Sequence, residues 1–266
     1  MKETLLRAIS GAVYVTLIVG GVWWGPESWV ALSTVFFILG IFEWKKLSKL
    51  AFPKKKSMAQ WILGIALYGG FAAWVIQGQP LPALPLAILA GILLLGHTVY
   101  LFVDKPEGST LSATTYLAFP LGIGLLIPFA TEGYQPMLLV VVFTGIWAND
   151  TFAYLLGKSI GKTPLAPMIS PKKTWEGFAG GLVGVYIILF LLKSYLPSGN
   201  WWELAILAVI ISFGSTVGDL LESKIKRKAG VKDSGAIMPG HGGILDRLDS
   251  YLFVAPLFYL YATLFY

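Results

Sequence analysis

The sequence predicts an all-α integral membrane protein with about nine transmembrane helices, and three observations lead to this fold class. Hydrophobic residues make up 56% of the 266 residues and charged residues only 13%, with a mean hydropathy of +0.72. Soluble domains carry about 25% charged residues. Apolar runs long enough to cross about 30 Å of hydrocarbon recur along the chain. The basic residues between those runs fall almost entirely on one side of the predicted membrane.

The runs expected to span the membrane are, in order, 8–24, 29–42, 61–76, 84–103, 115–130, 137–156, 178–195, 202–222 and 250–266. The second and third are short and the sixth contains Asn149 and Asp150, which leaves the count open by one. The first run is not followed by a small-residue cleavage site, so we expect it to remain attached.

The orientation follows from the basic residues. If the chain crosses nine times, all 20 lysines and arginines except Lys193 lie on one side. The positive-inside rule then places the N-terminus and the segment 224–247 in the cytosol and the C-terminus outside. An even number of spans would scatter these charges over both faces, so their asymmetry also supports an odd count.

Composition excludes several classes of function. The chain contains no cysteine, so disulfides and thiolate metal sites are excluded. Membrane topology accounts for the net charge of +6, and we expect no nucleic-acid partner.

The segment "SPKKTWEG" has the features of an anion site. Lys172 and Lys173 precede Thr174, a good helix N-cap, and Glu176 lies early in the helix that follows. Ordinary capping combined with positive-inside charge explains the segment equally well. Further along that helix, four glycines follow a small-xxx-small pattern that suits close packing within one chain or a homodimer: Gly177, Gly180, Gly181 and Gly184.

The carboxylates near the last two spans are the most specific signal. Asp219 has Glu222 and Ser223 on the same helical face, and Asp246 has Asp249 and Ser250 at the same spacing. Ionised carboxylates at a membrane boundary are costly unless they are paired, solvated or bound to cations. Oxygen ligands without nearby Cys or His favour hard cations, above all Mg²⁺.

Two alternatives to a magnesium site were weighed. Structural salt bridges from Asp246 to Arg247, or from Asp249 to Lys232, would leave the adjacent glycines and basic loop unexplained. A cation-coupled transporter would hold its carboxylates at the bilayer midplane. Here only Asp150 lies inside a span, and the other acids cluster at the cytosolic ends, which favours an enzyme acting on phosphates.

These residues resemble a known family signature. Thirteen positions over 27 residues match that of the phosphatidate cytidylyltransferases, also called CDP-diacylglycerol synthases: Ser223, Lys226, Arg227, Lys232, Asp233, Gly235, Pro239, His241, Gly242, Gly243, Asp246, Arg247 and Asp249. The stretch 149–177 is similar to a second family segment, so the resemblance covers residues 145–255. Met238 replaces the usual Leu, Ile or Phe, an apolar exchange, and the N-terminal half matches only in being hydrophobic.

The resemblance implies transfer of a cytidylyl group from CTP to phosphatidate, dependent on Mg²⁺. Asp219 and Asp246 are then expected to hold the metal, and Asp249 to complete a second site for a cation such as K⁺. The phosphate-contacting candidates are Lys172, Lys173, Lys226, Arg227 and Arg247, with Gly242 and Gly243 presenting backbone N–H groups. His241 is expected to contact or position substrate, and the remaining candidates for substrate binding are Asp150, Ser223, Lys232 and Asp233.

The resemblance also completes the expected organisation. Residues 1–135 are expected to contribute N-terminal transmembrane helices, and residues 136–266 to form a transmembrane catalytic region with cytosolic loops. We expect a multi-pass protein of the cell inner (plasma) membrane whose active site faces the cytosol. A cytidylyltransferase for ether-linked or isoprenoid lipid phosphates remains an alternative, because the phosphate chemistry would be the same.

Overall fold

A computed structural model describes residues 2–52, 58–78, 83–102, 112–238, 240 and 242–266. The α-helices are α1 Lys2–Trp23, α2 Pro26–Ala51, α3 Met58–Gln77, α4 Ala83–Phe102, α5 Phe119–Gly124, α6 Pro136–Ile160, α7 Trp175–Leu191, α8 Trp201–Lys228 and α9 Leu245–Phe265. Strands β1 Pro164–Ala166 and β2 Ser170–Thr174 lie between α6 and α7. All the predicted apolar runs lie in helical segments where the structure describes them.

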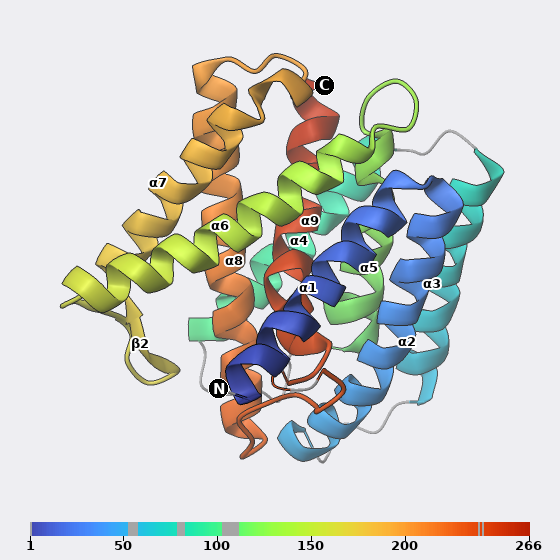
Figure 1. The fold of residues 1–266 in the computed structure, drawn as a ribbon. Coiled ribbons are helices and arrows are strands. Elements are labelled where there is room, and N and C mark those ends of the chain that lie inside the picture. Colours follow the sequence, from blue (N-terminus) through green and yellow to red (C-terminus); the bar gives the residue numbers. More distant parts are fainter. Residues whose placement is uncertain (1, 53–57, 79–82, 103–111, 239, 241) are drawn as a thin grey trace.

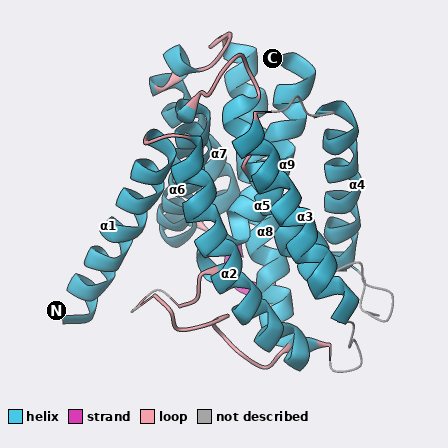
Figure 2. Ribbon diagram, turned by 90° about the vertical axis from the view of Figure 1, so that its right-hand side faces the viewer, coloured by secondary structure: helices cyan, strands magenta, loops and turns pink. Residues whose placement is uncertain are grey.

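Helix α9 forms the centre of the bundle. It packs against α8, α4 and α5, and almost all of its side chains from Leu248 to Ala262 are buried (Figure 1). The ends of the described chain lie at opposite ends of the molecule in both ribbon views (Figure 2). Among the described residues, four helices are long and apolar enough to cross a membrane: α3, α6, α8 and α9.

The predicted span at 115–130 is not one continuous helix. It consists of a π-helical segment Ala113–Ala118, the short helix α5 and a 3-10 turn Ile127–Phe129. Pro120 and Pro128 interrupt the backbone ladder, because proline supplies no N–H. Irregular backbone at membrane depth must be covered by protein, and this segment is buried almost throughout from 112 to 128. Nine continuous spans are therefore not what the described helices form.

The expectation of an all-α chain also needs correction. Strands β1 and β2 form an antiparallel hairpin in which Pro164 pairs with Thr174 and Ala166 with Ser170. Local pairing across a short turn satisfies backbone groups that project beyond the helices. The fold is thus helical with one small hairpin.

Candidate active site

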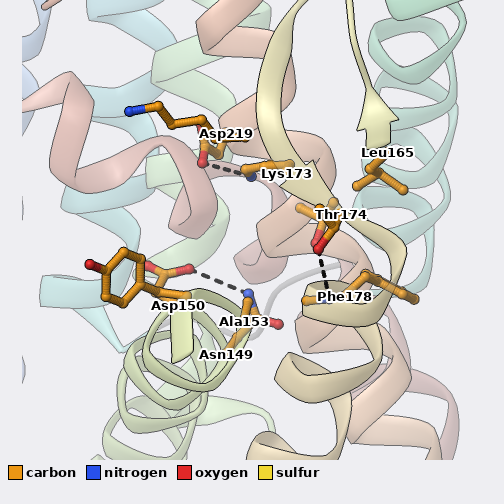
Figure 3. A pocket seen from close by; sticks show the side chains of 12 residues that line it. Asn149, Asp150, Ala153, Leu165, Lys173, Thr174, Phe178 and Asp219 are labelled. Atoms are coloured by element: carbon orange, nitrogen blue, oxygen red, sulfur yellow. Dashed lines mark hydrogen bonds and ion pairs between the residues drawn. The ribbon is translucent and has the colours of Figure 1, made fainter. Parts of the chain in front are cut away.

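A cavity of about 280 Å³ lies between α6, the hairpin, α7 and α8. Its polar lining includes Asn149 and Asp150 from α6, Lys172 and Lys173 from β2, and Asp219 from α8 (Figure 3). The Nζ atom of Lys173 lies 2.6 Å from Oδ2 of Asp219. The Asn149 amide donates to Oδ1 of Asp150 over 3.3 Å. The cavity therefore presents cations and carboxylates side by side.

The hairpin holds these lysines against the start of α7. The Thr174 hydroxyl caps α7 by accepting a hydrogen bond from the Gly177 N–H at 3.1 Å, as the sequence predicted. Glu176 accepts from the backbone N–H groups of Lys162 and Thr163 and from the Thr163 hydroxyl. Hydrogen bonds from its own backbone N–H and from Thr163 hold the pKa of this exposed carboxyl at about 2. Glu176 thus joins the end of α6 to the start of α7.

The glycine face of α7 packs within the chain. A side chain at Gly180, Gly181 or Gly184 would collide with Leu156, Asn149 or Phe152 of α6. These glycines therefore let α7 approach α6 closely. The predicted homodimer consequently gains no support from them and stays a prediction.

A second group of contacts surrounds Asp246 at the start of α9. Its Oδ2 accepts hydrogen bonds from the Ser234 N–H at 2.9 Å, the Ser234 hydroxyl at 2.8 Å and the Gly243 N–H at 2.8 Å. Its Oδ1 lies 2.6 Å from Nζ of Lys226. Charge-assisted bonds of this kind are about twice as strong as neutral ones, so Asp246 is held in one orientation.

Lys226 joins two carboxylates of adjacent helices. Besides Asp246 it contacts Oε2 of Glu222 at 3.2 Å. The other oxygen of Glu222 is buried without a hydrogen-bond partner. On the next helical turn the Ser223 hydroxyl donates to Oδ1 of Asp219 at 3.0 Å. Within the described residues, these pairs take the place of the Asp246–Arg247 and Asp249–Lys232 salt bridges considered from the sequence.

A second cavity of about 230 Å³ separates α1, α6 and the first turn of α9. Its lining combines Asp150, Asp246 and Asp249 with the apolar side chains of Phe143 and Trp147. Asp150 lines both cavities, so the two polar groups meet at this residue. A charged head with an apolar body would match such a lining.

The structure brings most of the predicted residues to these two cavities. Lys172, Lys173, Asp219 and Asp150 line the first, and Asp246, Asp249 and Arg247 the second. Three further candidates, Arg227, Lys232 and Asp233, are exposed on the stretch around the end of α8. His241 lies outside the described residues.

The glycines and the carboxylates differ in detail from the expectations. The Gly243 N–H donates to Asp246, and the Gly242 carbonyl accepts from Met238 at 2.9 Å. In the part of the chain that the structure describes, no three His, Cys, Asp or Glu side chains converge as a ready-made metal site. Magnesium commonly uses one or two carboxylates together with substrate phosphates, and the oxygen atoms of Asp219, Asp246 and Asp249 fit that ligand type.

Sequence reasoning missed Glu43 of α2, which reaches the same loop as Asp246. Its side chain is 5% exposed and accepts hydrogen bonds from the Ile244 and Leu245 N–H groups. The sequence contained one signal, because Glu43 is the only acidic residue between Glu27 and Asp104.

Together these features define a helical membrane protein with a carboxylate- and lysine-rich site suited to phosphates. A sequence model described as the cytidylyltransferase family matches residues 5–265, and the chain belongs to this family. The match extends well beyond residues 145–255, where the sequence motifs lie.

Several relatives carry a more specific name. A phosphatidate cytidylyltransferase of Brucella abortus is 30% identical over 270 residues, covering 100% of this chain and 95% of the relative. One of Staphylococcus saprophyticus is 40% identical over 200 residues, covering 74% of each chain. The chloroplastic phosphatidate cytidylyltransferase 4 of Arabidopsis thaliana is 53% identical over 147 residues, which are 52% of this chain and 37% of the relative. The chain thus spans about a third of the length of the plant protein, and the resemblance inferred from the signature is confirmed.

Proposed function

We propose that this protein is a phosphatidate cytidylyltransferase, which converts CTP and phosphatidate into CDP-diacylglycerol and pyrophosphate. The observation that carries the proposal is Asp150, which lines both the lysine-bearing cavity and the cavity with apolar walls. A polar nucleotide and a membrane lipid must meet at one point, and this residue lies where the two cavities meet. Family membership and the names of the relatives support the same reaction.

The reaction needs a strong nucleophile but little help from a base. A phosphate monoester is largely ionised near neutral pH, so an oxygen of the phosphatidate phosphate attacks the α-phosphorus of CTP directly. A new P–O bond forms while the bond between the α-phosphorus and the bridging oxygen breaks, and pyrophosphate leaves with that electron pair. The protein's task is to position two anions against each other.

Lysines of the first cavity supply the opposing charge. Lys172 is exposed and lines the cavity, and Lys173 is paired with Asp219. When CTP binds, its phosphates compete with Asp219 for the Lys173 ammonium. Release of the Asp219 carboxylate from that ion pair makes its oxygens available in the same step.

Asp219 and Asp246 are the residues proposed to hold Mg²⁺, with Asp249 at a second cation such as K⁺. A bound magnesium ion would neutralise charge on the triphosphate and on the leaving pyrophosphate. Lys226 neutralises Asp246 in this structure through the 2.6 Å contact, and it keeps Glu222 as an alternative partner at 3.2 Å. Lys226 can therefore turn toward Glu222 when Asp246 binds a cation.

The site is proposed to face the cytosol of a bacterial inner membrane. The lopsided lysines and arginines, together with the opposite positions of the two termini, support an odd number of crossings with the N-terminus inside. The division into residues 1–135 and a catalytic region 136–266 stays a proposal of the same kind, as does a homodimer.

The first experiment is pyrophosphate release by the detergent-purified protein with CTP, Mg²⁺ and phosphatidate, beside reactions that lack each component. We expect release only when all three are present. Release with an isoprenoid ether-lipid phosphate and none with phosphatidate would reassign the lipid substrate. Absence of release with both lipids would contradict the proposed function.

The orientation has a separate test, because the chain has no cysteine of its own. Met168 in the hairpin turn is 94% exposed, and Glu132 is exposed on the loop between α5 and α6. In intact cells an impermeant maleimide should label Glu132→Cys, and it should label Met168→Cys only after permeabilisation. The reverse pattern would contradict a cytosolic site.

A further inference from the structure

We propose that Glu43 of α2 is a positioning residue for Asp246, acting through the loop 234–245. This inference rests on the proposed function, since it concerns how one half of the chain orders the active site of the other. The C-terminal end of α2 lies beside the loop that precedes α9 (Figure 1). Nothing in the signature residues includes Glu43, which belongs to a helix that the sequence motifs leave out.

The Glu43 carboxylate ties down the start of α9. Its Oε1 accepts from the Ile244 N–H at 3.0 Å and its Oε2 from the Leu245 N–H at 2.9 Å. The first N–H groups of a helix have no partner within the helix, and here a side chain from a distant helix satisfies two of them. Negative charge is also favourable at a helix N-terminus. Glu43 therefore caps α9 from across the fold.

Ser234 connects Glu43 to Asp246 directly. Its hydroxyl lies 3.2 Å from Oε2 of Glu43 and 2.8 Å from Oδ2 of Asp246. A hydroxyl has one proton to donate, so it serves one carboxylate at a time. Its N–H donates to Asp246 as well. A shift of Glu43 would thus release the Ser234 hydroxyl and loosen the contacts that orient Asp246.

The loop is packed closely around the Glu43 carboxylate. A Cβ atom built on Gly235 would collide with Oε1 of Glu43, and one on Gly243 would collide with Glu43 and with the Ser234 hydroxyl. Two signature glycines are therefore explained by the space that this carboxylate occupies. Close backbone approach is a recurring reason for glycine.

Helix α2 holds Glu43 in place through its neighbours. The adjacent Trp44 is 2% exposed, and its ring stacks on Tyr116 with centroids 4.5 Å apart. Leu47, one turn further, is 1% exposed. The helix end that bears Glu43 is thus fixed by buried contacts, as positioning of a second residue requires.

The test compares Glu43→Gln with a matched control, Glu203→Gln. An amide keeps one acceptor and turns an NH₂ group toward a donor, so one of the three donors at Glu43 loses its partner. Glu203 is also a buried carboxylate at 3% exposure, and it accepts from Gly199 and Ser198 at the opposite end of α8. Both substitutions remove a buried charge, but only one lies beside Asp246.

Two measurements distinguish positioning from general stability. In Glu43→Gln we expect the Mg²⁺ concentration for half-maximal pyrophosphate release to rise about 10-fold to 100-fold, a range typical for residues that orient metal ligands. We also expect faster hydrogen–deuterium exchange in peptides covering 234–248. In Glu203→Gln exchange should rise only around 198–204, with an unchanged Mg²⁺ requirement. An unchanged requirement in Glu43→Gln would overturn the proposal, even if the variant were less stable.

A second variant covers the case in which Glu43→Gln does not fold. Ser234→Ala removes only the hydroxyl shared by the two carboxylates, and it should raise the Mg²⁺ requirement in the same direction by a smaller factor. A wild-type requirement in Ser234→Ala would then overturn the proposal. The exchange measurement needs no substrate, so failure of the unmodified protein to release pyrophosphate would contradict the proposed function alone. Unchanged exchange at 234–248 in both variants would contradict the role of Glu43 alone.

Discussion

Replacing Asp246 with Asn should affect both stability and turnover, because the carboxylate has structural partners as well as a proposed metal. The side chains of Asp246 and Lys226 are 7% and 11% exposed, and their contact is 2.6 Å long. The three donors at Oδ2 would keep the Asn oxygen as their acceptor. The Asn NH₂ group would then face the Lys226 ammonium, and the ion pair would be lost.

The magnitude follows from this geometry. Removing one partner of a buried ion pair costs about 3–5 kcal/mol. Lys226 retains Glu222 at 3.2 Å, which places the expected loss of unfolding free energy near the lower end, about 3 kcal/mol. For a chain of this size that corresponds to a fall in Tm of about 6–12 °C. Loss of a group that stabilises transition-state charge lowers kcat by at least about 100-fold.

The assay combines thermal unfolding, followed by tryptophan fluorescence, with pyrophosphate release well below the lowered Tm. Glu132→Gln, which removes one exposed carboxylate from the loop between α5 and α6, serves as the control with unchanged Tm and turnover. Wild-type turnover in Asp246→Asn would refute the assignment of Asp246 to the metal. An unchanged Tm would refute the structural part of the reasoning.

Three further changes test other parts of the site. Lys173→Ala should raise the KM for CTP while changing stability by less than about 1 kcal/mol, because the Lys173–Asp219 side chains are 27% and 37% exposed and such pairs contribute little; steady-state kinetics and Tm check this. Gly242→Ala should cost about 1–2 kcal/mol for its left-handed backbone and also lower kcat, because the new Cβ would lie 2.7 Å from Oδ2 of Asp246; Tm and kcat are measured together. The contribution of Glu176, whose pKa is lowered to about 2, is present above the ordinary glutamate pKa and lost only as pH falls through the folded value, so hydrogen exchange corrected for intrinsic rates should show constant protection of 162–176 between about pH 5 and 8.

Each of these has a contradicting result. An unchanged KM for CTP in Lys173→Ala would return the lysine to a topological role. Gly230 has a similar φ of +70° and no atom within 4 Å of an added Cβ, so Gly230→Ala is the control for backbone strain. Equal loss of kcat in both glycine variants would exclude displacement of Asp246. Loss of protection of 162–176 within that pH range would contradict the hydrogen bonds assigned to Glu176.

The contrast between Thr174 and Glu43 shows where sequence reasoning succeeded and where it ended. Thr174 caps α7 as predicted, because capping depends on residues three positions apart in the chain. Glu43 contacts Ser234 across 191 residues of sequence, and no local pattern encodes that contact. Its meaning emerged only when the end of α2 met the start of α9.

The fifth predicted run gives a second example. Its hydrophobicity correctly indicated a segment within the helical bundle, but Pro120 and Pro128 divide it into three short helical pieces. The four-glycine pattern of α7 likewise indicated close packing, and the structure identified the partner as α6 of the same chain. Composition and spacing describe a surface, whereas the fold decides what covers it.

The sequence by itself determined the membrane class, the positions of the apolar runs and the family signature, because each depends on residue type at short spacing. Only the tertiary structure decided which lysine neutralises which carboxylate: Lys173 pairs with Asp219, and Lys226 with Asp246 and Glu222. Ion pairing depends on distances of a few ångströms between separate elements. Those distances are set by how β2, α8 and α9 pack, which no stretch of sequence specifies alone.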